Sequence, residues 1–168
     1  VMTGKIVPYL FIGLIQPSTS RAAFWPVSQL TDTGAGSLRD AIQNSGPGDT
    51  IQFAANVHGG TIALNSEIAL GHTLFVAGPG ASILVVSGSG MDRVFLIYDG
   101  NPVLLSGLTI RDGLMQGGTG TSGGQCQDAG NGGTVYGGAI LATNLQSLIL
   151  SNCWVTANVA NAGGAARR

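Results

Sequence analysis

Short runs of apolar residues, separated by glycine, proline and asparagine, dominate the chain between residues 51 and 155. Several runs alternate apolar with polar positions, which is the period of a half-buried β-strand. The predicted strands are residues 51–53, 61–64, 68–70, 74–76, 83–86, 94–97, 103–105, 108–110, 139–141, 148–150 and 153–155. Strands this short are unusual in sandwiches and barrels. The pattern therefore predicts many short strands joined at tight corners.

One helix is predicted, over residues 37–48. Ser37 is a suitable N-cap, and Asp40 at the third helical position completes a weak capping box. The apolar side chains on one face are those of Leu38, Ala41 and Ile42. Gly46, Pro47 and Gly48 end the helix. A helix of about two turns does not persist alone, so we expect it to lie on an apolar surface.

An internal repeat indicates how the strands are arranged. Residues 103–110 align without a gap on residues 148–155, so that apolar positions match and Ser106 stands opposite Ser151. The first strand of this unit recurs at residues 74–76. With three strands in each repeat, the repeats begin near Ile51, Leu74, Val103 and Leu148. The longest interval contains a glycine-rich insertion, residues 114–135.

This repeat predicts an all-β chain folded as a right-handed parallel β-helix of about four three-strand coils, residues 49–168, after a lead-in segment at 23–36. The helix at 37–48 would cover the first coil. Two inward columns are expected, Ile51, Leu74, Val103 and Leu148 in one, and Leu64, Val85, Ile110 and Val155 in the other. The last coil is expected to pair with further coils or an oligomeric partner, as in a fragment of a longer solenoid.

Residues 1–22 have the pattern of a secretion signal. Lys5 precedes an apolar run at residues 6–15, and the small residues Ser20 and Ala22 follow. The run is shorter than the about 20 residues that a membrane-spanning helix needs. The alternative is an apolar first strand or arm packed on the domain.

Composition and charge exclude several classes of protein. Charged residues make up 9% of the chain and the formal net charge is -1, so no basic face is available for nucleic acid. The high aliphatic content argues against disorder, and glycine lacks the strict every-third register of collagen. Two cysteines, Cys126 and Cys153, would form a disulfide in an exported chain. The alternative is two thiols, with Cys153 as a small inward side chain.

Two short signatures resemble a known family. Gly137, Gly138, Ala139 and Ile140 match the GGAI signature of polymorphic outer membrane protein repeats, and Val155 to Asn158 resembles the accompanying Phe-x-x-Asn, with Val155 replacing Phe. Residues 36–42 and 48–51 resemble the amino-terminal cap of surface proteins in the pectate-lyase-like superfamily. The resemblance covers residues 30–168. The resemblance implies a secreted or cell-surface protein that is associated with the outer membrane and is often an adhesin. It also implies structural roles for Ser37 and for the signature residues Gly137, Gly138, Ala139, Ile140, Val155 and Asn158.

The charged residues at strand ends are the candidates for enzymatic chemistry. A polysaccharide lyase needs a base and acidic groups, for which the candidates are Asp92, Arg93, Asp99, Arg111 and Asp112. A glycoside hydrolase needs two carboxylates about 5–10 Å apart, a role open to Asp99 and Asp112 if their corners stack. The alternative interpretation is that Asp92 with Arg93, and Arg111 with Asp112, are solvated corner ion pairs.

Other polar residues suggest structure or binding. His58 and His72 lack a third ligand at a sensible spacing, so no metal or cofactor is expected. Asn152 and Asn158 suit corners, where their amides bond to neighbouring backbone. In the insertion, Gln125, Asp128 and Asn131 are candidate binding residues, although a loop without a ligand is the equal alternative. Calcium at Asp128 would lack carboxylates.

The sequence therefore predicts an exported, non-enzymatic surface protein, adhesin-like or a display scaffold, with carbohydrate or a host-surface ligand as partner. The alternative is a carbohydrate-active enzyme, lyase or hydrolase, with Arg111, Asp112 and Asp99 on an outer sheet face. A trimeric spike of the phage type is a third alternative.

Overall fold

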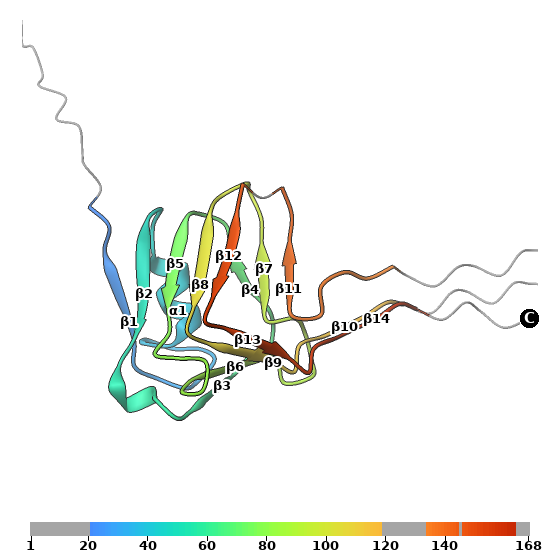
Figure 1. Cartoon of the computed structure of the whole chain (residues 1–168), viewed down its shortest axis with the longest axis horizontal. Helices are drawn as coiled ribbons and strands as arrows, with labels where there is room; N and C mark the ends of the chain where they lie inside the picture. The colour runs from blue at the N-terminus through green and yellow to red at the C-terminus, as the bar shows by residue number, and fades with distance from the viewer. Residues whose placement is uncertain (1–20, 119–133, 145, 164–168) are drawn as a thin grey trace, which may run out of the picture.

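The computed structural model describes residues 21–118, 134–144 and 146–163, and these are built mainly of parallel β-strands (Figure 1). The helical elements described are one α-helix, α1 (Leu38–Asn44), and one short 3-10 turn, η1 (Ala55–Val57). The prediction of a strand-rich chain is confirmed. The predicted secretion signal lies almost entirely outside the described residues. No helix in the described part of the chain has the length and apolar character needed to cross a membrane.

The strands of the described residues form four sheets, in which every pairing is parallel. Sheet A contains β1 (Phe24–Val27), β2 (Asp49–Phe53), β5 (Leu74–Ala77), β8 (Val103–Ser106) and β12 (Leu148–Ser151), in that order. Sheet B contains β3 (Thr61–Ala63), β6 (Val85–Ser87), β9 (Thr109–Arg111) and β13 (Trp154–Thr156). Sheet C contains β4 (Ile68–Leu70), β7 (Phe95–Ile97) and β11 (Ile140–Ala142). Sheet D contains β10 (Leu114–Gln116) and β14 (Val159–Asn161).

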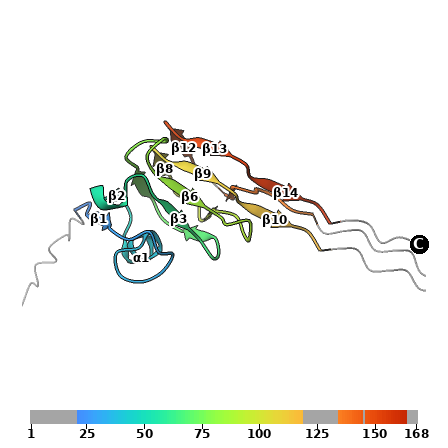
Figure 2. The same cartoon turned by 90° about the horizontal axis from the view of Figure 1, so that it is seen from below.

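Neighbouring strands in each sheet come from segments far apart in the sequence. The predicted alignment of residues 103–110 with 148–155 is confirmed, because Val103 pairs with Leu148, Ser106 with Ser151, and Ile110 with Val155. Figure 2 shows the strands of sheet B lying side by side, with β10 and β14 continuing beyond them. The two copies of the sequence repeat are therefore neighbouring, paired strands in the structure.

Three strands escaped the sequence analysis. β1 contains Pro26 and was assigned to the lead-in segment, although it pairs with β2. β10 was placed inside the insertion predicted at 114–135, but it pairs with β14 from Leu114 to Gln116. The predicted start of the insertion is therefore wrong, and residues 114–116 belong to the sheet framework. Both β10 and β14 are three-residue strands, too short to give a clear alternation.

The two predicted inward columns are correct in part. Ile51 pairs with Val76, not with Leu74, so the first column contains Leu74, Val103 and Leu148 without Ile51. In the second, Val85 pairs with Thr61 and is half-buried. The fully buried residues that stand in register there are Ile62, Val86 and Ile110. A difference of two residues in register, as at Ile51, keeps a side chain on the same face of the strand. A difference of one residue, as at Val85, moves it to the other face.

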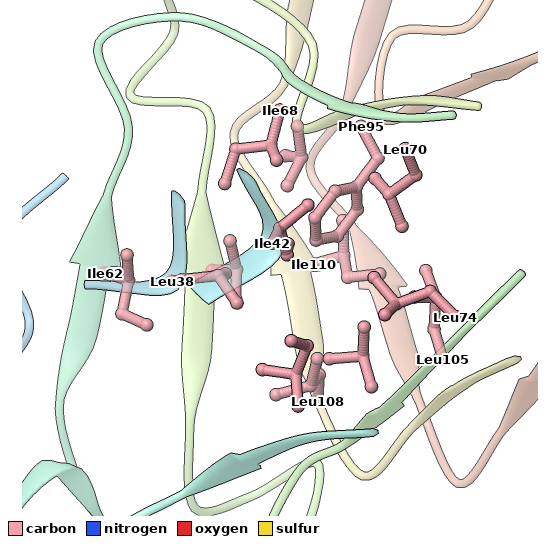
Figure 3. Packing of buried hydrophobic residues seen from close by; sticks show 14 of the residues in the cluster. Leu38, Ile42, Ile62, Ile68, Leu70, Leu74, Phe95, Leu105, Leu108 and Ile110 are labelled. Carbon is pink, nitrogen blue, oxygen red and sulfur yellow. The ribbon is translucent and has the colours of Figure 1, made fainter. Parts of the chain in front are cut away.

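The core is one cluster of aliphatic side chains with a single phenylalanine at its centre, Phe95 (Figure 3). Helix α1 contributes Leu38 and Ile42, which point into this cluster beside residues from the sheets. Burying such side chains supplies roughly 1.5–3 kcal/mol each against the conformational entropy of ordering the chain.

Ser37 caps α1, since its side chain accepts a hydrogen bond from the backbone N–H of Asp40 at 3.1 Å. In a capping box, the Asp40 side chain would accept a hydrogen bond from the backbone N–H of Ser37. Here the Asp40 carboxylate instead accepts from the backbone N–H of Gly36 at 3.1 Å. The helix ends at Asn44, earlier than the predicted residue 48. Ser45 takes an extended conformation there, which stops the helix before Gly46.

A buried carboxylate fastens the amino-terminal strand to the rest of the molecule. Asp49 accepts hydrogen bonds from the backbone N–H of Ala23 at 2.7 Å, from the indole N–H of Trp25 at 2.8 Å and from the N–H of Gly46 at 2.8 Å. The bond from Gly46 is the largest influence that lowers the pKa of Asp49 below its ordinary 3.8, followed by those from Ala23 and Trp25. The ionised form of Asp49 is thus part of the fold.

Replacing Asp49 by asparagine is expected to change how stability depends on pH. A lowered pKa in the folded state stabilises the fold above the ordinary pKa, and this stability is lost as pH falls through the lowered value. The urea midpoint of the wild-type chain should exceed that of Asp49→Asn at pH 7, and the gap should narrow below about pH 4. Asp99→Asn, at an exposed corner, is the control, and a gap for Asp49→Asn that is constant from pH 7 to pH 2 would contradict this expectation.

Candidate functional site

A groove of about 390 Å³ lies between α1 and the segment that carries β4. It is lined by Arg39, Ile42 and Gln43 of α1, by Glu67, Ile68, Ala69, Gly71 and His72, and by Tyr98. Ile42 and Ile68 are buried and form an apolar floor, whereas the rim carries polar groups and one aromatic ring. A concave site with a partly apolar floor and a few convergent polar groups is typical of small-ligand binding.

Arg39 is held in place at one end of the groove by four acceptor contacts. Its Nε and Nη2 donate to Oδ1 of Asp32 at 3.0 and 2.8 Å, and the Asp32 side chain is almost fully buried. Its Nη1 and Nη2 also donate to the carbonyl oxygens of Glu67 at 2.9 Å and Ser66 at 2.7 Å. The guanidinium therefore joins the lead-in segment, α1 and the turn before β4, and its charge is already compensated.

Glu67 and Arg93 form a second, largely buried ion pair. Glu67 Oε2 lies 2.7 Å from Arg93 Nε, but the two groups are not aligned as a hydrogen bond, so the contact is mainly ionic. Burial raises the pKa of Glu67, the nearby Arg93 opposes that rise, and Asp92 adds to it. Asp92 also accepts from the backbone N–H of Glu67 at 3.3 Å. A carboxyl group with a raised pKa at a groove is a functional-site candidate.

At the other end of the groove, Tyr98 packs over Gly71. A β-carbon placed on Gly71 would lie 2.8 Å from the Tyr98 phenol oxygen, so only glycine lets the ring lie this close. His72 is held near the same end, since its Nε2 lies 3.1 Å from the hydroxyl of Ser45. Tyr98 is 37% exposed and keeps part of its ring available.

The described residues of the groove offer a ligand polar groups but no unpaired guanidinium. Both arginines near it already face carboxylates, and the Glu67 carboxyl group is in turn paired with Arg93, which leaves the Gln43 amide, the His72 imidazole and the Tyr98 phenol. Amides, carboxyls and phenols bond hydroxyl groups, and an aromatic ring offers an apolar surface. This arrangement suits a neutral polyhydroxylated ligand better than a polyanion.

The structure places Arg111 and Asp112 at an exposed corner after β9. Arg111 Nε lies 3.1 Å from Asp112 Oδ2, with side chains 47% and 37% exposed. Asp112 Oδ2 also accepts from the hydroxyl of Ser87 at 3.1 Å, and the Asp112 backbone has a φ of 54°. This is the solvated corner pair of the alternative interpretation, and such a pair contributes little to stability.

Asp99 does not join that corner. It follows β7 of sheet C, has a φ of 66°, and its carbonyl accepts from the side-chain amide of Asn101 at 3.0 Å. Asp112 instead follows β9 of sheet B. The hypothesis that the corners of Asp99 and Asp112 stack to form a carboxylate pair is wrong, because the two turns connect different sheets.

Among the remaining candidates, Gln125, Asp128, Asn131 and Cys126 lie outside the described residues. The others have structural roles. Asn158 bridges two corners, since its Oδ1 accepts from the N–H of Gly113 at 2.8 Å and its Nδ2 donates to the carbonyls of Ile110 and Thr156. Gly137 has a φ of 61°, and Gly138 lies against the backbone of Val159.

Other signature and cysteine positions lie near the same end of the sheets. Ala139 precedes β11 and Ile140 is its first residue, and Val155 in β13 is 46% exposed although it faces the same side as buried Ile110. The Cys153 thiol is half-buried, 3.4 Å from the carbonyl oxygen of Leu105. Within the described ranges, no cluster of three or more histidine, cysteine, aspartate or glutamate residues is placed to hold a metal ion.

Sequence reasoning missed the groove. Asp92 and Arg93 were considered as lyase candidates or as a corner pair with each other, and Glu67, the only glutamate in the chain, was not considered as a site residue. That rarity was the one available signal. Strand pairing, which places β4 beside β7, brings Tyr98 to the groove that Glu67 lines and brings Arg93 to Glu67.

Comparisons with known proteins give no relative from which a function could be transferred. No family model matches the chain, and no curated protein or solved structure is similar enough to count as a match.

Proposed function

We propose that the four sheets are faces of one right-handed parallel β-helix related to the pectate-lyase-like superfamily. Three observations support this architecture. All pairings are parallel, the chain from β2 onward passes through sheets A, B and C in turn before it returns to A, with β10 of sheet D inserted between B and C in the third circuit, and each return places the new strand beside the previous one. Crossover connections between parallel strands are right-handed in nearly all proteins, which gives the hand.

We infer that the protein is exported and acts at a cell surface, adhesin-like, as a non-enzymatic scaffold that binds carbohydrate. The amino-terminal pattern at residues 1–22 and the resemblance to outer membrane protein repeats support export. The observation that carries the binding role is the groove beside α1. There, the Tyr98 ring and the polar groups of Gln43 and Glu67 line one concave surface.

The chemistry of the groove narrows the class of carbohydrate. Because Asp32 and Glu67 face Arg39 and Arg93, neither guanidinium group is free to bind a uronate. A neutral oligosaccharide requires only hydroxyl partners and a ring for its apolar face. We therefore expect binding to neutral glycans in preference to polyuronates.

Replacing Tyr98 by alanine tests this site. The full chain is screened on an array of neutral, amino and uronic-acid oligosaccharides, and the best neutral ligand is then titrated calorimetrically. Tyr98→Ala should weaken binding about tenfold, which corresponds to roughly 1.4 kcal/mol. Gln43→Ala should weaken it less. Tyr136→Ala is the matched control, because Tyr136 is an exposed tyrosine that does not line the groove.

The result that would overturn this site is equal affinity in the wild-type chain and Tyr98→Ala, or the absence of any saccharide ligand. Release of reducing ends or of unsaturated products during the titration would instead support the alternative function, a carbohydrate-active enzyme. In that case Glu67, whose pKa is raised by burial, is the residue to replace first.

A further inference from the structure

The outward face of sheet A carries a row of mainly apolar side chains that crosses its five strands (Figure 1). Listed in register from β1 to β12, the row consists of Phe24, Thr50, Phe75, Leu104 and Ile149. Successive residues of a strand point to opposite faces of a sheet. The neighbours Ile51, Val76 and Leu105 are buried in the core, so the side chains of the row point away from it.

The exposure of this row does not depend on what lies at either edge of the sheet. Phe75 and Leu104 belong to β5 and β8, which have a paired strand on both sides. The Phe75 side chain is nevertheless 38% exposed, and Leu104 is half-buried. A further strand beside β1 or β12 would cover an edge, while outward side chains would keep their face of the sheet. The row is therefore a feature of the outer face of sheet A.

The second outward row of sheet A is uncharged and largely polar. It lies two residues further along each strand and consists, in register, of Pro26, Gln52, Ala77, Ser106 and Ser151. None of the described residues in the two rows carries a charge. The face therefore has no charge complementarity to nucleic acid, polyuronates or anionic membranes. Its amide and hydroxyl groups suit a neutral partner that carries hydroxyl groups.

The shape of this face favours a linear partner. Because parallel strands lie about 4.8 Å apart, the two rows are about 19 Å long and about 13 Å wide. They cover roughly 250 Å², whereas each partner in a stable protein interface contributes about 800 Å². A long, narrow and partly apolar face of this size fits a single polymer chain better than a globular protein or a second copy of this chain.

We propose that the outward face of sheet A binds a neutral, extended β-linked polysaccharide whose chain crosses the strands. The rings of Phe24 and Phe75 belong to strands two positions apart, with Thr50 between them. One strand spacing is close to the length of one sugar unit in an extended β-1,4-glucan, so the two rings meet alternate sugars. Each ring stacks on the apolar face of a sugar, and the polar groups of the second row bond its hydroxyl groups.

The test is calorimetric titration of the full chain with cellohexaose. Cellohexaose should bind, and cellobiose, which is too short to reach both rings, should bind more weakly. Maltohexaose, which is not extended, and the charged hexagalacturonate should bind more weakly as well. Phe75→Ala should raise the dissociation constant for cellohexaose about fivefold, as expected for the loss of one stacked ring.

Two control variants locate the binding surface. Ile83→Ala is matched to Phe75→Ala, because Ile83 is also 38% exposed but lies in the turn before β6, and it should bind as the wild type does. Tyr98→Ala alters the groove beside α1 and should also leave the affinity for cellohexaose unchanged. The inference does not rest on the ligand proposed for the groove, so the two sites can fail separately.

Phe75→Leu keeps an apolar side chain but removes the ring. It should weaken binding too, and it decides the outcome if circular dichroism shows that Phe75→Ala does not fold. The proposal is overturned if cellohexaose does not bind, if maltohexaose binds equally well, or if folded Phe75→Leu binds as tightly as the wild type. Sedimentation with neutral phosphatidylcholine vesicles that Phe75→Leu abolishes would also overturn it, because the face would then bind lipid.

Discussion

Replacing Phe95 by alanine should lower the free energy of unfolding by about 3–5 kcal/mol, the range for large aromatic side chains removed from a core. Phe95 is fully buried in β7, and its ring points into the middle of the cluster with Ile42, Leu70 and Ile110 around it (Figure 3). It is the only fully buried aromatic ring among the described residues, so no neighbouring ring can move to fill the space. Since whole domains are stable by only about 5–15 kcal/mol, this one change should remove much of the margin.

The measurement is the urea midpoint and slope of each purified variant at neutral pH. Phe75→Ala is the matched control, because Phe75 is 38% exposed on β5, on the outward side of sheet A. It should cost about 1 kcal/mol, since surface changes rarely cost more. Equal losses in the two variants would mean that the cluster around Phe95 does not carry the stability of the fold.

Replacing Gly107 by alanine should cost about 3 kcal/mol through two separate effects. The first is the backbone conformation, because Gly107 has a φ of 61°, in the left-handed region that costs a side-chain-bearing residue roughly 1–2 kcal/mol. The second is steric, because a β-carbon there would overlap the carbonyl group of Gly78 and would lie 3.1 Å from the backbone nitrogen of Gly80. Overpacking against backbone typically costs a further 1–3 kcal/mol.

Gly90→Ala separates these two effects. Gly90 has a similar φ of 66°, but nothing lies within 4 Å of its added β-carbon. It should therefore lose only the conformational part, about 1 kcal/mol. Thermal and urea denaturation of both variants measure the difference. If Gly107→Ala were as stable as Gly90→Ala, the close approach of the two corners at Gly78 and Gly107 would not restrict the fold.

The arrangement of strands was more predictable than their limits. Ser106 opposite Ser151 follows from matching apolar positions, because side chains that stack in a core must repeat in kind. β1 was missed because Pro26 argues against a strand, and only the structure places it at an edge, where proline is tolerated. β10 was hidden because a glycine-rich stretch follows it directly, so that no alternation marks where the sheet ends.

The candidate site was much less predictable, because its residues meet only through pairing between strands. Arg111 and Asp112 adjoin in the sequence and were easily noticed, yet they form an exposed pair. Glu67 and Arg93 are far apart in the sequence and are brought together by the pairing of β4 with β7. Burial changes the chemistry of Glu67, and burial at one residue depends on every strand around it.

The separation of pairing partners also governs how the chain reaches its native state. Every ladder joins segments two dozen residues apart or more, as in Thr61 with Val85 and Val103 with Leu148. The entropy of closing each loop has to be lost before any pairing repays it, and proteins dominated by such non-local pairs fold slowly. During that time the uncharged strands near the carboxyl end are exposed, so we expect the yield of refolding to rise with dilution and to fall at high protein concentration.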